Sequence, residues 1–206
     1  MNAYVKRDLY LNRLIVRRDN GQIKAITGPR RSGKSFLLDP IYKDYLISKG
    51  VPEDNIIIIS FDIEDEDTPQ ELLDREKLKE YLYSRIASQT ENYYVFLDEI
   101  QEVDGFERIV NGLNKRQNVD VYVTGSNAKF LSKEISTIFR DRGHEIRCNP
   151  FSFKEFSSQR TEAIRELWQE YYTYGGMPGL LRRKTKLQKA AYLQDLWRKT
   201  YLTDIK

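Results

Sequence analysis

The sequence predicts a three-layer α/β fold in which helices cover both faces of a five-stranded, mainly parallel sheet. Short apolar runs bounded by polar residues recur along the chain, and longer segments with helical periodicity separate them. Strands buried on both faces read as continuous apolar runs, and parallel strands need crossover helices between them. A phosphate-loop motif also stands between the first run and the first helix. The runs are QIKAIT (22–27), NIIIISF (55–61), YYVFL (93–97), VDVYVT (119–124) and HEIRC (144–148).

Composition sets limits on the possible functions. The chain has 206 residues, which suffices for one substantial core and a second small module. Its 34 Lys and Arg against 31 Asp and Glu give a net charge of +3, too small to indicate a nucleic-acid partner by itself. One cysteine and one histidine exclude an internal disulfide framework and a zinc cluster. Without an export signal or membrane span in the sequence, we expect a cytoplasmic protein.

The phosphate-loop motif is GPRRSGKS, in which Gly28, Gly33, Lys34 and Ser35 match G-x-x-x-x-G-K-S. Glycines let consecutive backbone N–H groups point at phosphate oxygens, and the following helix adds a favourable dipole. We expect Lys34 to bridge the β- and γ-phosphates and Ser35 to bind magnesium. The expected nucleotide contacts are Gly28, Pro29, Arg30, Arg31, Ser32, Gly33, Lys34, Ser35 and Phe36.

The helix after this loop should place Phe36, Leu37, Ile41, Tyr45 and Leu46 on one face. Pro40 lies too deep for a first-turn proline, so a kink is expected there. A second helix is predicted over residues 70–88.

The third strand ends in Asp98 and Glu99, about 65 residues after the loop. An acid at a neighbouring strand end can hold magnesium through water, and the next residue can orient and deprotonate an attacking water. We assign metal positioning to Asp98 and water activation to Glu99. A competing interpretation takes the catalytic acid from Glu64, in the acidic stretch DIEDED that otherwise reads as a solvated loop after the second strand.

Polar residues also follow the fourth strand. Thr124, Ser126 and Asn127 compete to contact the γ-phosphate or position the water, because strand ends of this kind line the ligand crevice of open α/β sheets. The alternative is a turn that caps a helix over AKFLSKEI (128–135). Before the fifth strand, Arg140 and Arg142 are candidates for an activating arginine, although loop arginines are usually solvated.

From about Asn149 the pattern becomes helical. Ile164, Leu167, Trp168, Tyr171 and Tyr172 form one stripe that ends at Gly175 and Gly176, and a second helix is expected from about Lys186 through Leu187, Ala190, Ala191 and Leu193. We divide the chain into a core of residues 1–155 and a helical lid or linker of residues 156–206. The uncovered apolar face of the last helix leads us to expect a downstream domain.

These stretches together resemble a known family, the prokaryotic AAA-type ATPases with a poorly characterised C-terminal domain, close to the STAND-like P-loop proteins. The resemblance implies a P-loop NTPase sheet of the ASCE type with strand order 5-1-4-3-2, and ATP as the ligand. It also implies Ser126 or Asn127 as sensor and Arg142 as arginine finger. Gly176, Met177 and Pro178 look like a G-x-P element placed against adenine and ribose. Tyr10, Leu11 and the residues before the first strand would form the wall around the base. The matching stretches are ITGPRRSGKS, VFLDEIQEVDGFERIVNGL, VYVTGSNAKFLS, RDRG, PFSFKEF and YGGMPGLL.

The leading functional hypothesis is an ATP-hydrolysing switch or motor that uses Mg²⁺, hydrolyses slowly in isolation and can form a homo-oligomer. One alternative is a regulatory scaffold that holds ATP and turns it over slowly. Another is a nucleic-acid-binding module that contacts phosphates through basic residues. These are Arg13, Arg17, Arg18, Arg182, Arg183, Lys184, Lys186 and Lys189.

Overall fold

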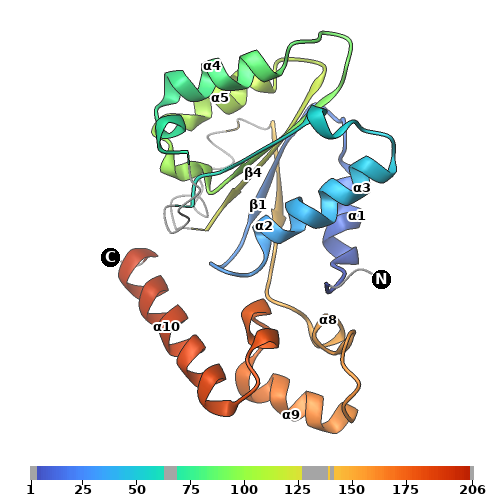
Figure 1. The fold of residues 1–206 in the computed structure, drawn as a ribbon, viewed down its shortest axis with the longest axis vertical. Coiled ribbons are helices and arrows are strands. Elements are labelled where there is room, and N and C mark those ends of the chain that lie inside the picture. The colour runs from blue at the N-terminus through green and yellow to red at the C-terminus, as the bar shows by residue number, and fades with distance from the viewer. Residues whose placement is uncertain (1–3, 63–68, 127–138, 140–141, 205–206) are drawn as a thin grey trace.

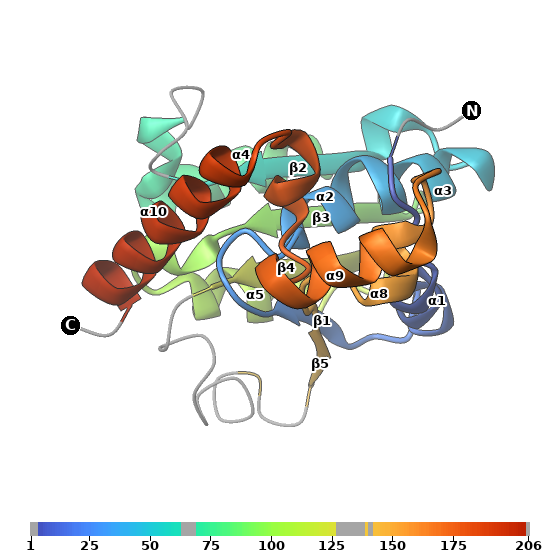
Figure 2. The same ribbon diagram turned by 90° about the horizontal axis from the view of Figure 1, so that it is seen from below.

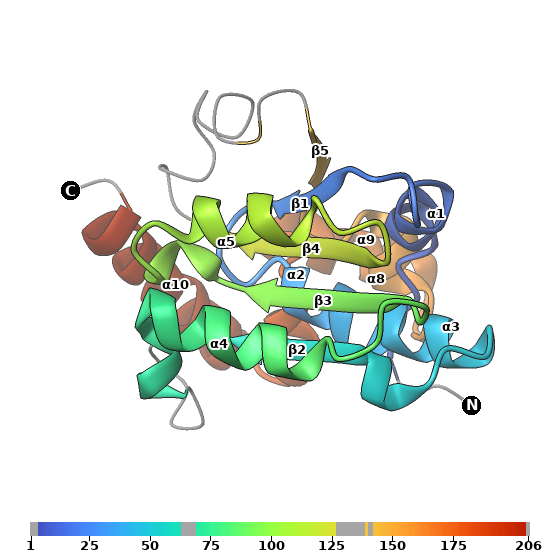
Figure 3. The same cartoon turned by 90° about the horizontal axis from the view of Figure 1, so that it is seen from above.

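The computed structural model describes residues 4–62, 69–126, 139 and 142–204. Its sheet has five strands in the order β2-β3-β4-β1-β5, and every ladder is parallel. Read from the other edge, this is the order 5-1-4-3-2 that the resemblance implied, and Figure 3 shows the strands in this sequence. The strands are β1 (Ile23–Thr27), β2 (Ile56–Ser60), β3 (Tyr93–Asp98), β4 (Val119–Gly125) and β5 (Gly143–Arg147).

Burial explains why the strand sequences are continuous apolar runs. Every residue of the three central strands is buried, whereas the edge strands β2 and β5 are buried only in part. Helices α4 (Arg75–Arg85) and α5 (Phe106–Leu113) cover one face of the sheet. Helices α1 (Asp8–Val16) and α3 (Lys43–Ser48) cover the other (Figures 1 and 3). The three-layer expectation is therefore confirmed.

The helix after the phosphate loop is irregular, as the proline predicted. It begins as α2 (Lys34–Phe36), passes through the π-helical turn η1 (Leu37–Tyr42) and continues as α3. Asp39 has non-helical dihedral angles and precedes Pro40 through a cis peptide bond. Leu37, Ile41 and Leu46 are fully or almost fully buried, but the Phe36 side chain is 41% exposed and does not share their face.

The segment expected as one helix over residues 70–88 is two elements. A 3-10 turn, η3 (Gln70–Leu73), comes first, and α4 then begins after Asp74. Asp74 is extended and accepts hydrogen bonds from the backbone N–H groups of Glu76 and Lys77, which caps the new helix. The helix ends at Arg85, so Ile86 lies beyond it. Two other short 3-10 turns are η2 (Glu53–Asn55) and η4 (Ile100–Glu102).

The chain leaves β5 toward a C-terminal helical module, which we define as residues 152–204. It lies below the sheet in Figure 1, on the side of the phosphate loop, and Figure 2 views it from beneath. The module contains α8 (Phe153–Ser157), α9 (Ile164–Tyr174), the 3-10 turn η5 (Pro178–Arg182) and α10 (Lys186–Asp204). The expected boundary after residue 155 thus falls inside α8.

The apolar stripes expected on these last helices do not form a buried face. On α9 Leu167 is buried and Tyr171 is half-buried, but Ile164, Trp168 and Tyr172 are 66%, 53% and 82% exposed. On α10 Leu187 is 80% exposed. Much of the apolar surface of these two helices is therefore exposed, because one short module offers too few partners to cover a whole apolar face. Of the helices described, none combines the length and apolar character needed to cross a membrane.

Candidate nucleotide-binding site

The phosphate loop joins β1 to α2 at the carboxyl edge of the sheet, and glycines determine its path. Gly28 has φ +142°, and a Cβ there would lie 2.1 Å from the carbonyl oxygen of Cys148. Gly33, at φ +93° and ψ 29°, is the left-handed residue that caps the N-terminus of α2. Both backbone positions favour glycine over any L-residue with a side chain. The two motif glycines therefore have separate roles, one permitting close packing and one permitting the turn.

Lys34 lies inside the loop and its side chain is 3% exposed. Its Nζ is 3.3 Å from the carbonyl oxygens of Gly28 and Pro29 and 3.5 Å from Oε1 of Glu99. A buried ammonium requires such partners, because charge without hydrogen bonds is costly in the interior. Lys34 thereby links the loop to the end of β3.

Asp98, Ser35 and Thr124 form a hydrogen-bonded group beside the lysine. The hydroxyl of Thr124 donates to Oδ1 of Asp98 and also accepts the backbone N–H of Glu99 at 3.0 Å. Ser35 makes a side-chain hydrogen bond to Asp98. Burial raises the pKa of Asp98 above its usual range, and the hydrogen bonds from Thr124 and Ser35 act in the opposite direction. Asp98 and Ser35, the two predicted magnesium residues, are thus adjacent.

Glu99 adopts a left-handed backbone conformation with φ 50° and ψ 44°. Its Oε2 accepts hydrogen bonds from Nε2 of Gln101 at 2.6 Å and from Oγ of Ser126 at 2.9 Å. Left-handed conformations are uncommon for residues other than glycine and occur at sites where surrounding contacts hold them. The strained turn after β3 therefore presents this carboxylate to Lys34 and to the end of β4.

The loop and its neighbours fit a nucleotide with Mg²⁺ on structural grounds. The Ser32 side chain is fully buried, and its Oγ has no hydrogen-bond partner among the described residues. Within the described part of the chain, no three His, Cys, Asp or Glu side chains are grouped to hold a metal by themselves. One carboxylate and one hydroxyl are the sparse protein ligand set that suits Mg²⁺ when phosphate and water complete its coordination.

A cavity of about 620 Å³ lies between the phosphate loop and the C-terminal helical module. Pro178 faces the loop, since its Cγ would be 3.7 Å from a Cβ on Gly33. Phe36 and Tyr4 meet edge to face in its wall, with ring centroids 5.4 Å apart. The lining residues are Tyr4, Val5, Arg7, Arg31, Gly33, Phe36, Phe151, Gln159, Pro178, Gly179, Leu181, Arg182, Arg183 and Tyr192.

Gly176, Tyr10 and Leu11, which were also expected to contact the base, do not line this cavity. Gly176 packs against the backbone of Phe151, where a Cβ would be 2.0 Å from the carbonyl oxygen. Tyr10 lines a separate cavity of about 880 Å³ next to α8, and Leu11 packs against the core cluster beneath α1. Tyr4 and Val5 line the cavity beside the loop instead. Both belong to the segment before the first strand that was expected to wall the base, but no pattern singled them out, because the path of this segment depends on packing of Val5 against Phe151.

Arg142 is exposed and precedes β5. Since Ile23 pairs with Gly143 and Thr27 with Arg147, Arg142 lies beside the start of β1, whereas the phosphate loop follows its end. At about 3.3 Å per residue, the length of β1 separates them by roughly 16 Å. Arg142 therefore lies near the amino ends of the parallel strands, and the Lys34 site lies at their carboxyl ends. Asn127, Arg140 and Glu64 lie outside the described residues, and His144 is a half-buried residue of β5.

The proposed basic surface is partly occupied by contacts within the chain. Arg183 lies over the ring of Tyr192 at 4.4 Å and donates to the carbonyl of Gly179 at 2.7 Å. Lys189 is 8% exposed and pairs with Glu170 at 2.6 Å. These two residues support the C-terminal module itself, which leaves a smaller basic surface than the sequence indicated.

Comparison with known proteins gives a family. The model of a family described as an AAA domain matches residues 20–157. An uncharacterized protein of Haemophilus influenzae is 36% identical over 98% of this chain, which covers 51% of that relative. An uncharacterized protein of Methanocaldococcus jannaschii is 33% identical over 76% of this chain, which covers 36% of it. The chain thus spans about half of one relative and about a third of the other.

Two solved structures have a similar fold. PCH-2 from C. elegans aligns with 79% of this chain and 44% of its own, at 16% identity and a TM-score of 0.50. Cdc6p from Pyrobaculum aerophilum aligns with 77% of this chain and 50% of its own, at 14% identity and a TM-score of 0.51. The strand order, the phosphate loop and the family match agree, and the chain belongs to the AAA domain family of P-loop proteins.

Proposed function

We propose that this chain binds ATP with Mg²⁺ and hydrolyses it, and that the nucleotide state controls the position of the C-terminal helical module. One observation carries the proposal: Lys34, Asp98 and Glu99 converge where the phosphate loop meets the end of β3. A lysine, a metal-positioning acid and a second acid at the carboxyl edge of a parallel sheet form the set needed for phosphoryl transfer to water.

Each residue has a separate task. Lys34 and the backbone N–H groups of the loop hold the phosphates, and Ser35 and Asp98 would hold Mg²⁺. When bound, Mg²⁺ neutralises charge on the phosphate oxygens. Glu99 orients a water molecule and accepts its proton, and Ser126 orients Glu99 through their hydrogen bond. We assign the sensor role to Ser126 because its hydroxyl already contacts the catalytic carboxylate.

The cavity between loop and module is the proposed site for ribose and base. Aromatic and apolar side chains of Tyr4, Val5 and Phe36 suit a planar base, and Pro178 approaches from the module. We propose that the residues before α8 form the ATPase core and that the C-terminal helical module is a lid that closes over the nucleotide, which moves the boundary expected after residue 155 to the start of α8.

We infer that full activity requires a second copy of the chain. Arg142 is too far from the phosphate loop of its own chain to contact the transferred phosphate. Its side chain is exposed just before β5, which suits insertion into the site of a neighbouring copy. A guanidinium supplied in this way neutralises charge on the transferring oxygens. An assembly would therefore hydrolyse ATP faster than the isolated chain.

A slowly hydrolysing scaffold is a second candidate. The contacts of Glu99 with Lys34, Gln101 and Ser126 favour it, since a carboxylate with all these partners is less available to a water molecule. Single-turnover measurements separate the two. Hydrolysis of bound ATP over hours, even at high protein concentration, would support the scaffold.

The test of the proposal is the variant Lys34→Ala. Titration calorimetry with ATP and Mg²⁺ should show binding by the parent protein and none by the variant, while circular dichroism shows the same fold. Lys43→Ala is the matched control, because Lys43 lies on α3 and pairs with Glu53 away from the loop. Unchanged ATP affinity in Lys34→Ala would remove the basis for the proposal.

A further inference from the structure

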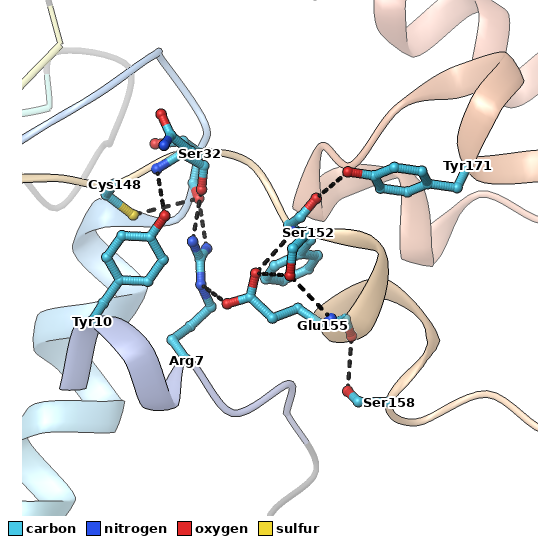
Figure 4. Close-up of polar contacts among 10 residues, drawn as sticks. Arg7, Tyr10, Ser32, Cys148, Ser152, Glu155, Ser158 and Tyr171 are labelled. Carbon is cyan, nitrogen blue, oxygen red and sulfur yellow. Dashed lines mark hydrogen bonds and ion pairs between the residues drawn. The ribbon is translucent and has the colours of Figure 1, made fainter. Parts of the chain in front are cut away.

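Arg7 is a buried cation that lies next to the phosphate loop but has no part in the proposed chemistry. It precedes α1 and is 2% exposed. Figure 4 shows its guanidinium between two segments that are far apart in the sequence. NH1 donates to the carbonyl of Ser32 at 3.1 Å, and NH2 donates to the carbonyl of Asn149 at 2.6 Å. The rings of Tyr10 and Phe151 lie 4.5 and 5.0 Å from its central carbon.

Glu155 on α8 provides the counter-charge. Its Oε1 is 2.9 Å from Nε of Arg7, and its Oε2 accepts hydrogen bonds from the backbone N–H and the hydroxyl of Ser152, each at 2.8 Å. Ser152 in turn caps the helix by accepting the Glu155 N–H, which completes a capping box. One carboxylate therefore joins Arg7 to the first turn of α8.

The contact with Ser32 has a consequence for the anion-binding donors. The Ser32 carbonyl and the Gly33 N–H belong to the same peptide unit, which is planar and trans, so they point in opposite directions. Gly33 lies in the left-handed region, where glycine has little intrinsic preference to hold one orientation. By binding the carbonyl, Arg7 fixes the direction of the N–H at the N-terminus of α2.

Phe151, whose ring lies beside Arg7, connects these contacts to later residues of the C-terminal helical module. Phe151 donates its N–H to the carbonyl of Gly176 at 2.7 Å, and its own carbonyl accepts the Tyr171 hydroxyl at 2.9 Å. Any shift of α8 relative to Arg7 therefore also moves the segment that carries Pro178. A buried guanidinium loses a charged partner only at a large free-energy cost. A displacement of Glu155 should therefore be accompanied by a displacement of Arg7 and of the Ser32 carbonyl that it binds.

We propose that Arg7 is a positioning residue that aims the Gly33 N–H at the nucleotide phosphates and, through Glu155, couples the phosphate loop to the C-terminal helical module. The coupling makes lid position and loop geometry interdependent. This inference rests on the proposed function for its role in ATP binding, but the coupling itself exists without nucleotide.

The first experiment uses hydrogen exchange of the nucleotide-free protein. Glu155→Gln removes the charge but retains a side chain that can complete a capping box. The amides of Ser32 and Leu37, which donate to the carbonyls of Pro29 and Gly33, should exchange at least about tenfold faster in this variant, since a tenfold change corresponds to the loss of one charged contact. Ser152→Ala is the matched control, because it weakens the same helix cap but keeps the Glu155 charge beside Arg7 and the backbone N–H that holds Oε2. Loop exchange that is unchanged in Glu155→Gln, or equally increased in Ser152→Ala, would overturn the proposal.

The second experiment measures ATP binding. Arg7→Lys keeps the charge but cannot bind both carbonyls and the carboxylate at once, so its ATP affinity should fall about tenfold, as should that of Glu155→Gln. Parent-like affinity in both variants would contradict the positioning role while leaving the proposed function intact. If the parent itself binds no ATP, the proposed function fails, and the nucleotide-free exchange rates still decide whether Arg7 couples loop and module.

Discussion

The Ser126 hydroxyl donates a 2.9 Å hydrogen bond to Oε2 of Glu99, so the end of β4 holds the carboxylate that follows β3. These residues are far apart in the sequence but lie at the ends of paired parallel strands. The contact fixes one oxygen of Glu99, while Lys34 lies 3.5 Å from the other. The orientation of the proposed base is therefore set by the end of β4 and the first residue of α2 together.

Glu99→Gln should bind ATP with parent-like affinity and lose at least about 100-fold in turnover, which is the lower range for removing a general base. An amide can keep the hydrogen-bonded position but cannot accept a proton. Steady-state phosphate release and calorimetry on the same preparation measure both quantities. Glu64→Gln is the competing variant. Loss of turnover in Glu64→Gln, together with normal turnover in Glu99→Gln, would transfer the role of the base to Glu64.

Turnover per chain should rise with protein concentration, and Arg142→Ala should abolish the rise without weakening ATP binding. An arginine supplied by a neighbour can contribute about 10³ or more in rate. Mixing Glu99→Gln with Arg142→Ala provides the decisive measurement, since an interface of the two variants can pair an intact base with an intact arginine. Activity that stays flat with concentration and is not restored on mixing would mean that Arg142 acts only within its own chain's structure.

Gly176→Ala should destabilise the protein by about 1–3 kcal/mol, the usual cost of overpacking. The added methyl would lie 2.0 Å from the Phe151 carbonyl oxygen. The backbones of Phe151 and Gly176 must then move apart, which weakens the hydrogen bond from the Phe151 N–H to the Gly176 carbonyl. Urea unfolding measures the change. Gly112→Ala on α5 is the control, because its Cβ would have an ordinary 3.4 Å contact with Tyr83, and alanine favours helices. Equal stability of the two variants would contradict this account of Gly176.

Acid should loosen α10 from α9. Glu170 accepts two hydrogen bonds from Arg160 and pairs with Lys189, and chiefly the Arg160 contact lowers the pKa of Glu170 below its ordinary 4.5. A lowered folded pKa gives stability that is present above the unfolded pKa and is lost as pH falls through the folded pKa.

Thermal unfolding between pH 7 and pH 3 should therefore show a loss of about 1 kcal/mol from this group, a value discounted for partial exposure. Glu170→Gln should be less stable at pH 7 and should lack this part of the acid dependence. Glu166→Gln, on the exposed side of the same helix, should behave like the parent. Parallel pH profiles for all three proteins would show that the Glu170 contacts add no stability.

The sequence alone determined the class of the fold and the identity of the phosphate loop. Buried parallel strands require continuous apolar runs, and a loop that curls around an anion requires glycine at Gly28 and Gly33, so local composition encodes both. The pair Asp98 and Glu99 could also be found, because an acid at the end of an apolar strand is a local pattern. The kink at Pro40 was predictable for the same reason, since proline cannot donate the helix hydrogen bond.

The tertiary structure decided which residues approach the loop from elsewhere. Arg7, Gln101 and Tyr4 have no motif, and their positions follow from contacts such as that between Arg7 and Glu155, which are separated by most of the chain. Burial of the α9 stripe was likewise not fixed by periodicity. An amphipathic pattern states that a helix has an apolar face, whereas coverage of Trp168 and Tyr172 depends on what the fold places opposite them.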